Sequence, residues 1–175
     1  MTSETTEEGN MKRTLNIEAI RKLRRQISTM EHIDVFEEES ECDIWDGDTD
    51  NLCGFSMTEY LQNWGNPNYG ACGTVACIAG CALLQREKER ESYKISHPQN
   101  VGYDYYIVEA ARYLGLDYKE AQALFVPEPV SLNDITPQQA ANMLAWIETC
   151  DEESLNFRRI LSKWNEIVFN IKEQE

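Results

Sequence analysis

Residues 69–84 read YGACGTVACIAGCALL, and this segment decides the fold. Its first residues are typical of a turn, and Thr74 is placed to cap a helix that starts after it. From Val75 to Leu84 the residues are small or apolar on every side of such a helix, which leaves no face suited to water. We therefore expect a buried helix, at about residues 75–87, at the centre of an all-α domain.

Packing is the expected role of five residues in this segment: Thr74, Ala76, Cys77, Gly80 and Cys81. Glycine inside a helix costs about 1 kcal/mol relative to alanine. Gly80 therefore indicates that another backbone approaches this helix closely. Cysteine often behaves as a small apolar residue, and Cys77 and Cys81 fit that interpretation.

Helix signals recur along the rest of the chain, and no segment alternates over the length of a strand. Asn16 is placed as the N-cap of a basic first helix, and Thr136 precedes a proline at the start of another. Asp117 and Glu120 have the spacing of a capping box. Gly115 is suited to the left-handed residue that ends the helix before it. These signals support a single all-α domain.

Length and composition favour one globular domain with charged N-terminal extensions. With 175 residues, 42% of them hydrophobic, the chain can bury a core without disulfides or metals. We expect a disordered tail at residues 1–10, a basic helix and an acidic loop at residues 11–50, and a helical domain at residues 51–175 that packs with residues 11–30. The sequence shows no signal peptide and no apolar run of the ~20 residues that a membrane span requires. We therefore expect a cytoplasmic protein whose six cysteines are reduced.

Charge is distributed unevenly along the chain, whose formal net charge is −15. Residues 26–85 contain no Lys or Arg, whereas residues 12–25 contain six. We expect the acidic loop to form a binding strip for a basic protein surface, and its residues are Glu37, Glu38, Glu39, Glu41, Asp43, Asp46, Asp48 and Asp50. Alternatively, the loop lies near the basic first helix and neutralises its charge, or the charge only maintains solubility.

The same charge disfavours direct binding to nucleic acid, which needs Lys and Arg to replace counterions. It leaves open a basic protein partner, and a mimic of nucleic-acid charge is a narrower version of that hypothesis. Such a mimic requires carboxylates at duplex-like intervals.

A small cysteine-dependent hydrolase or transferase is the main alternative function. Cys72 lies just before the predicted helix, where the helix dipole can lower the pKa of a thiol. His97 is the histidine that could serve as its base. The region after His97 is predicted to be helical, whereas papain-like cysteine peptidases place the histidine on a β-sheet.

Metal and cofactor motifs are incomplete. Cys77 and Cys81 share a helical face, but the chain lacks the paired Cys-x₂-Cys turns of structural zinc sites. Residues 46–50 resemble the start of a calcium loop, yet Asn51 occupies its glycine position and Met57 the position of its bidentate glutamate. We therefore predict no metal and no cofactor.

Aromatic residues suggest a third class, a helical pocket for a small molecule. It would be formed by Trp45, Trp64, Tyr103, Tyr105 and Tyr106. Ordinary packing in the core and on the surface is the favoured explanation of such residues.

Residues 72–82, Cys-Gly-Thr-Val-Ala-Cys-Ile-Ala-Gly-Cys-Ala, resemble the Cys-Gly-Thr-x-x-Cys-x-Ala-Gly-x-Ala signature of small, largely uncharacterised bacterial and phage proteins. The segment Phe55-Ser56-Met57 and the run from Leu114-Gly115-Leu116 to Ala140-Ala141 are similar to further motifs of that family. The resemblance implies a phage or bacterial cytoplasmic setting and no particular activity.

These observations together favour a non-enzymatic interaction protein. We expect it to bind a host macromolecule through its acidic surface, without contact to a membrane.

Overall fold

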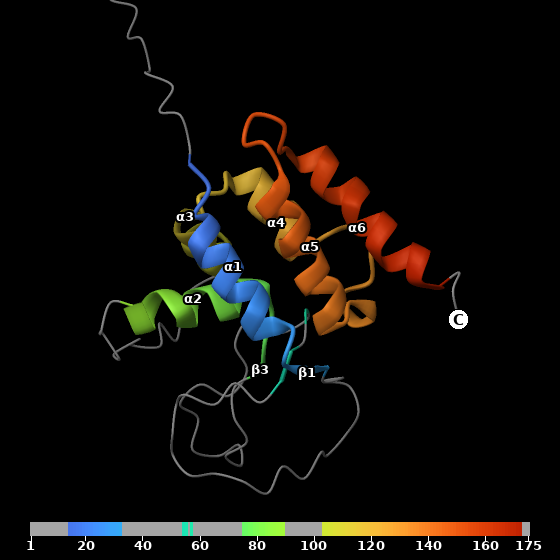
Figure 1. Cartoon of the computed structure of the whole chain (residues 1–175), viewed down its shortest axis with the longest axis horizontal. Coiled ribbons are helices and arrows are strands. Elements are labelled where there is room, and N and C mark those ends of the chain that lie inside the picture. The colour runs from blue at the N-terminus through green and yellow to red at the C-terminus, as the bar shows by residue number, and fades with distance from the viewer. Residues whose placement is uncertain (1–13, 33–53, 56, 58–74, 90–102, 173–175) are drawn as a thin grey trace, which may run out of the picture.

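The computed structural model describes residues 14–32, 54, 55, 57, 75–89 and 103–172. Helices dominate this part of the chain (Figure 1), which confirms the all-α prediction. Their bounds are α1 (Ile17–Ile27), α2 (Ile78–Glu89), α3 (Tyr103–Leu114), α4 (Tyr118–Phe125), α5 (Pro137–Thr149) and α6 (Phe157–Lys172), with a 3₁₀ turn, η1, at Leu132–Asp134. No described helix has both the length and the apolar character needed to cross a bilayer.

Helix starts follow the predicted caps. The Asn16 side chain accepts a hydrogen bond from the Ala19 amide at 3.2 Å. Asp117 and Glu120 form the predicted capping box at α4, with bonds of 2.8 and 3.0 Å. Thr136 caps α5 in the same reciprocal way with Gln139. These three predictions are confirmed.

Gly115 ends α3 with a φ of +75°, as predicted for a left-handed C-terminal residue. The structure adds a second constraint, because a Cβ at this position would overlap the carbonyl oxygen of Thr14 and lie 2.9 Å from Cα of Leu15. Directly beside this contact, the Asn16 amide donates to the carbonyl of Leu114 at 3.0 Å. The end of α3 is therefore joined to the start of α1.

A small parallel sheet, which the sequence did not predict, lies before α2. It consists of β1 (Glu31–His32), β2 (Gly54–Phe55) and β3 (Val75–Ala76), in the order β1-β2-β3. Because Val75 and Ala76 belong to β3, α2 starts at Ile78, three residues after the predicted start. Strands of two residues are too short to show alternation, and each is held by a partner distant in sequence. Thr74, the predicted cap, lies outside the described residues.

The first half of α2 is buried, and residues 77–84 are buried without interruption. Gly80 lies within this buried run. The helix packs on α3 and α1, while the other side of α1 packs most extensively on α5 (Figure 1). α6 covers α4 and α5 and contributes Trp164, which is fully buried. α1 thus joins the α2–α3 pair to the C-terminal helices.

Candidate functional site

Most residues predicted to carry function lie outside the described part of the chain. These are Cys72, His97, Trp45, Trp64 and the acidic strip from Glu37 to Asp50. The structure describes the burial of three predicted packing residues, Cys77, Gly80 and Cys81, and it places the backbone of Ala76 in β3.

Cys77 and Cys81 have surroundings unlike those of a nucleophile. Cys77 is 1% exposed and Cys81 is fully buried. Burial raises the pKa of the Cys81 thiol well above its usual range, with a further contribution from the neighbouring Cys77. A raised pKa suppresses the thiolate, which is the reactive form. Among the described residues, no group of three or more His, Cys, Asp or Glu side chains could hold a metal ion.

Three members of the predicted aromatic pocket, Tyr103, Tyr105 and Tyr106, lie on α3, and the structure describes the side chains of the last two. Tyr105 and Tyr106 pack edge to face, with their ring centroids 5.9 Å apart. Tyr105 is partly exposed, whereas burial raises the pKa of the half-buried Tyr106. This is a common packing arrangement of aromatic side chains.

A polar cluster that the sequence analysis missed lies between α2 and α3. Glu109 accepts hydrogen bonds from Arg86, at 2.5 Å, and from Arg112. Both arginines, with Glu89 and Tyr113, line an open hollow of about 300 Å³. Burial, followed by the proximity of Glu89, raises the pKa of Tyr113. The side chains that line the hollow carry both positive and negative charge, so the hollow does not select one class of ligand.

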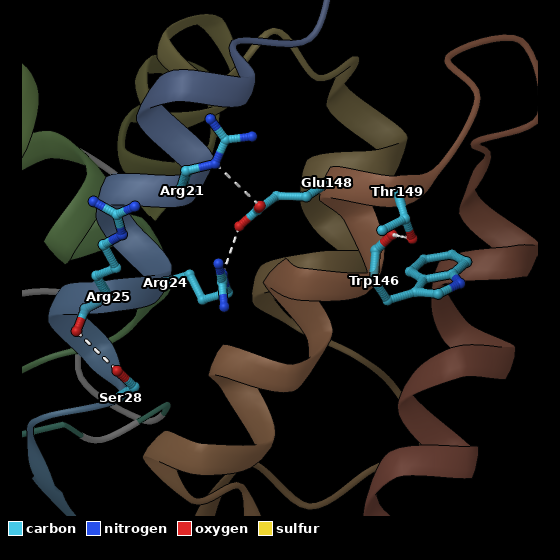
Figure 2. A network of polar contacts seen from close by, with 7 residues as sticks. All are labelled: Arg21, Arg24, Arg25, Ser28, Trp146, Glu148 and Thr149. Carbon is cyan, nitrogen blue, oxygen red and sulfur yellow. Dashed lines mark hydrogen bonds and ion pairs between the residues drawn. The ribbon is translucent and has the colours of Figure 1, made fainter.

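The basic residues of α1 are largely held by carboxylates of other helices. Glu148 of α5 binds Nε of Arg24 at 2.6 Å and Nε of Arg21 at 3.4 Å (Figure 2). Lys22 binds Glu89 of α2 at 2.9 Å, and this hydrogen bond is the main reason why the pKa of Lys22 is raised. α1 is thus linked electrostatically to both neighbours. The link between α1 and α5 has a signal in the sequence, because Glu148 is the one charged residue in the otherwise neutral α5.

Charge is nearly balanced in the part of the chain that the structure describes. Its helices, strands and connecting loops contain 12 Lys and Arg against 15 Asp and Glu, a net charge of −3 out of −15 for the whole chain. Residues 33–53 alone contain nine Asp and Glu and no Lys or Arg. Most of the excess negative charge therefore lies outside the helical body.

Comparisons with protein-family models, curated proteins and solved structures found no match for this chain. The family resemblance of residues 72–82 stays a prediction.

Proposed function

We propose that this protein is a non-enzymatic interaction protein that binds a basic protein partner through the acidic residues between β1 and β2. The observation that carries the proposal is the contrast in charge. The helical body is close to neutral, whereas residues 33–53 hold nine acidic residues without a basic one.

Ion pairs within the body support this assignment. Lys22, Arg24 and Arg86 each bind a carboxylate of another helix, at 2.9, 2.6 and 2.5 Å. These pairs use the body's own acids to neutralise its own cations. The acidic residues of the strip have no such pattern of alternating sign in their sequence, which favours a partner that supplies positive charge.

A basic protein surface fits this charge better than nucleic acid does, because phosphates would be repelled. In the narrower version of the proposal, the partner is a nucleic-acid-binding protein of the host, and the carboxylates imitate the phosphates that it binds. Complementary charge of this kind accelerates association and makes binding sensitive to salt.

The test is capture of a partner from lysate of the native host by the tagged full chain, followed by titration of the isolated complex with NaCl. We expect the affinity to fall steeply between 0.05 and 0.5 M NaCl, since screening weakens exposed ion pairs; the Debye length shortens from about 10 Å at 0.1 M to about 3 Å at 1 M. Affinity that does not change with ionic strength would exclude the electrostatic mechanism.

A matched pair of variants locates the binding surface. The test variant replaces four acids of the strip by amides: Glu37→Gln, Glu38→Gln, Glu39→Gln and Glu41→Gln. The control removes the same charge from exposed positions on the helical body: Glu128→Gln, Asp134→Asn, Glu153→Gln and Glu166→Gln. We expect at least a tenfold loss of affinity for the test variant and less than twofold for the control. Equal losses would contradict the proposed site.

A further inference from the structure

The arginines of α1 carry more positive charge than their described ion-pair partners neutralise. Arg21 and Arg24 share one carboxylate, that of Glu148. Arg25 is exposed, makes no ion pair with a described residue and points away from Glu148 in Figure 2. Arg24 and Arg25 follow Arg21 by three and four residues, the spacings that bring side chains together on the surface of a helix. These three arginines, which we call the arginine face, have an excess of two positive charges after Glu148 is counted.

Two of these guanidinium groups are held in place and still have donors for a further ligand. Glu148 is 11% exposed and accepts one hydrogen bond from Nε of Arg21 and one from Nε of Arg24. A guanidinium has five N–H donors in total, so four on each of these arginines are left over. The two side chains are 49% and 36% exposed. An incoming oxyanion thus meets donors that are already partly ordered.

A phosphoryl group matches this face in charge and in geometry. A phosphorylated side chain carries a charge of about −1.5 to −2 at pH 7 and has three acceptor oxygens. It therefore compensates the whole excess of the arginine face, whereas one carboxylate compensates half of it. The planar fork of arginine donates two parallel hydrogen bonds to phosphate oxygens. Clusters of arginines are a recurrent means of recognising phosphorylated protein segments.

The exposure of the face favours a phosphorylated protein over a small phosphate ester. Sites for small molecules are concave and bury roughly 70–90% of the ligand, whereas the arginine side chains lie open to solvent. A protein segment covers such a surface with contacts on both sides of the phosphoryl group. Glu18, one turn before Arg21, is 81% exposed and lies 3.7 Å from its ion-pair partner Lys22. Its carboxylate suits a basic residue of the same segment.

We propose that the arginine face of α1 binds a phosphorylated side chain of the basic protein partner. This inference rests on the proposed function for the overall charge of the partner, while the phosphoryl contact itself depends on described residues of α1 and α5. The chain has a net charge of −15, so added negative charge on a partner weakens the general attraction. At the arginine face the same charge strengthens binding. Phosphorylation of the partner therefore acts as a signal that this protein reads.

The test compares two peptides that differ in one phosphoryl group. The first is Lys-Lys-Ala-Ser-Ala-Lys-Lys with blocked ends, and the second is the same heptapeptide phosphorylated on serine. Fluorescence anisotropy of the labelled peptides measures their affinities for the full chain in 0.05 M NaCl. Attraction by net charge alone predicts weaker binding of the phosphopeptide, because phosphorylation offsets about two of its four positive charges. We expect the opposite, a gain in affinity of at least threefold. Equal affinities, or a loss on phosphorylation, would overturn the proposal.

Two double variants locate the gain. Arg21→Gln combined with Arg25→Gln removes two charges from the face and keeps the shorter of the two bonds to Glu148. In this variant we expect phosphorylation to weaken peptide binding at least twofold. The control, Lys119→Gln with Arg158→Gln, removes two exposed charges elsewhere and should keep the threefold gain. Arg21→Lys combined with Arg25→Lys keeps the charge without the planar forks and should show a smaller gain than the wild type. A full gain in the glutamine variant would overturn the proposal.

Two further probes distinguish other ligands of the same face. Free phosphoserine represents a small phosphate ester, and the heptapeptide with glutamate in place of serine represents a carboxylate. We expect both to bind at least threefold more weakly than the phosphopeptide, and equal binding of either would overturn the assignment to a phosphorylated protein. If the phosphopeptide binds and the unphosphorylated peptide does not, the proposed function fails while the arginine face stands. If both bind without a gain on phosphorylation, the assignment of the arginine face alone fails.

Discussion

Replacement of Glu148 by glutamine tests the link between α1 and α5. The substitution keeps the shape of the side chain and removes its charge, so that Arg24 and Arg21 lose their ionic partner. Hydrogen bonds to charged groups contribute about 1.5–3 kcal/mol when both partners are shielded from water. Glu148 is 11% exposed, but the two arginine side chains are 36% and 49% exposed, so solvent screening reduces this value. We expect the free energy of unfolding to fall by about 1–2 kcal/mol. The loss is not larger because the amide oxygen of glutamine can still accept a hydrogen bond from an arginine.

Urea denaturation followed by circular dichroism measures this loss, and the melting temperature should fall by roughly 2–8 °C for a chain of this size. Glu166→Gln is the matched control, because Glu166 is 57% exposed and its ion-pair partner among the described residues is Lys163, one turn away on α6. The control should lose less than about 0.5 kcal/mol, as is usual for exposed pairs within a helix. If Glu148→Gln is no less stable than Glu166→Gln, the α1–α5 ion pair does not stabilise the fold and the reasoning is refuted.

Three further predictions concern the backbone, a helix cap and alkaline pH. Gly115→Ala should lower the free energy of unfolding, measured by urea denaturation, by at least about 2 kcal/mol, because alanine is strained at positive φ and its Cβ meets the backbone at Thr14 and Leu15. A loss below about 0.5 kcal/mol would show that the backbones of α3 and α1 separate readily at this contact. Thr136→Ala should cost about 1 kcal/mol through loss of the α5 cap, and the conservative Thr136→Ser should recover most of it. Burial raises the pKa of the Cys81 thiol above its ordinary value of 9.0, so the folded state retains a proton that the unfolded state releases, and urea midpoints should fall as the pH rises above 9. Cys81→Ala should flatten this fall, and midpoints that rise with pH would contradict the assigned burial.

Local interactions explain which features the sequence could predict. The caps at Asn16, Asp117 and Thr136 depend on residues three positions away, so their signals are visible in a short window of sequence. The burial of α2 was equally predictable, since an uninterrupted run of small and apolar residues has no polar face to expose.

Contacts between distant residues explain what could not be predicted. Val75 and Ala76 fit a helix by composition, but pairing with Gly54 and Phe55 makes them a strand. Arg24 and Glu148 are 124 positions apart, and their ion pair exists only because α1 packs on α5.

The sequence by itself thus determined the helices, their caps, the buried segment and the separation of charge along the chain, because each depends on composition or on neighbours within one turn. Only the tertiary structure decided which carboxylates hold the basic residues of α1 and where the acidic segment is attached. Both depend on long-range packing: α5 and α2 supply Glu148 and Glu89, and β1 pairs with β2, the two strands that flank the acidic segment in the sequence.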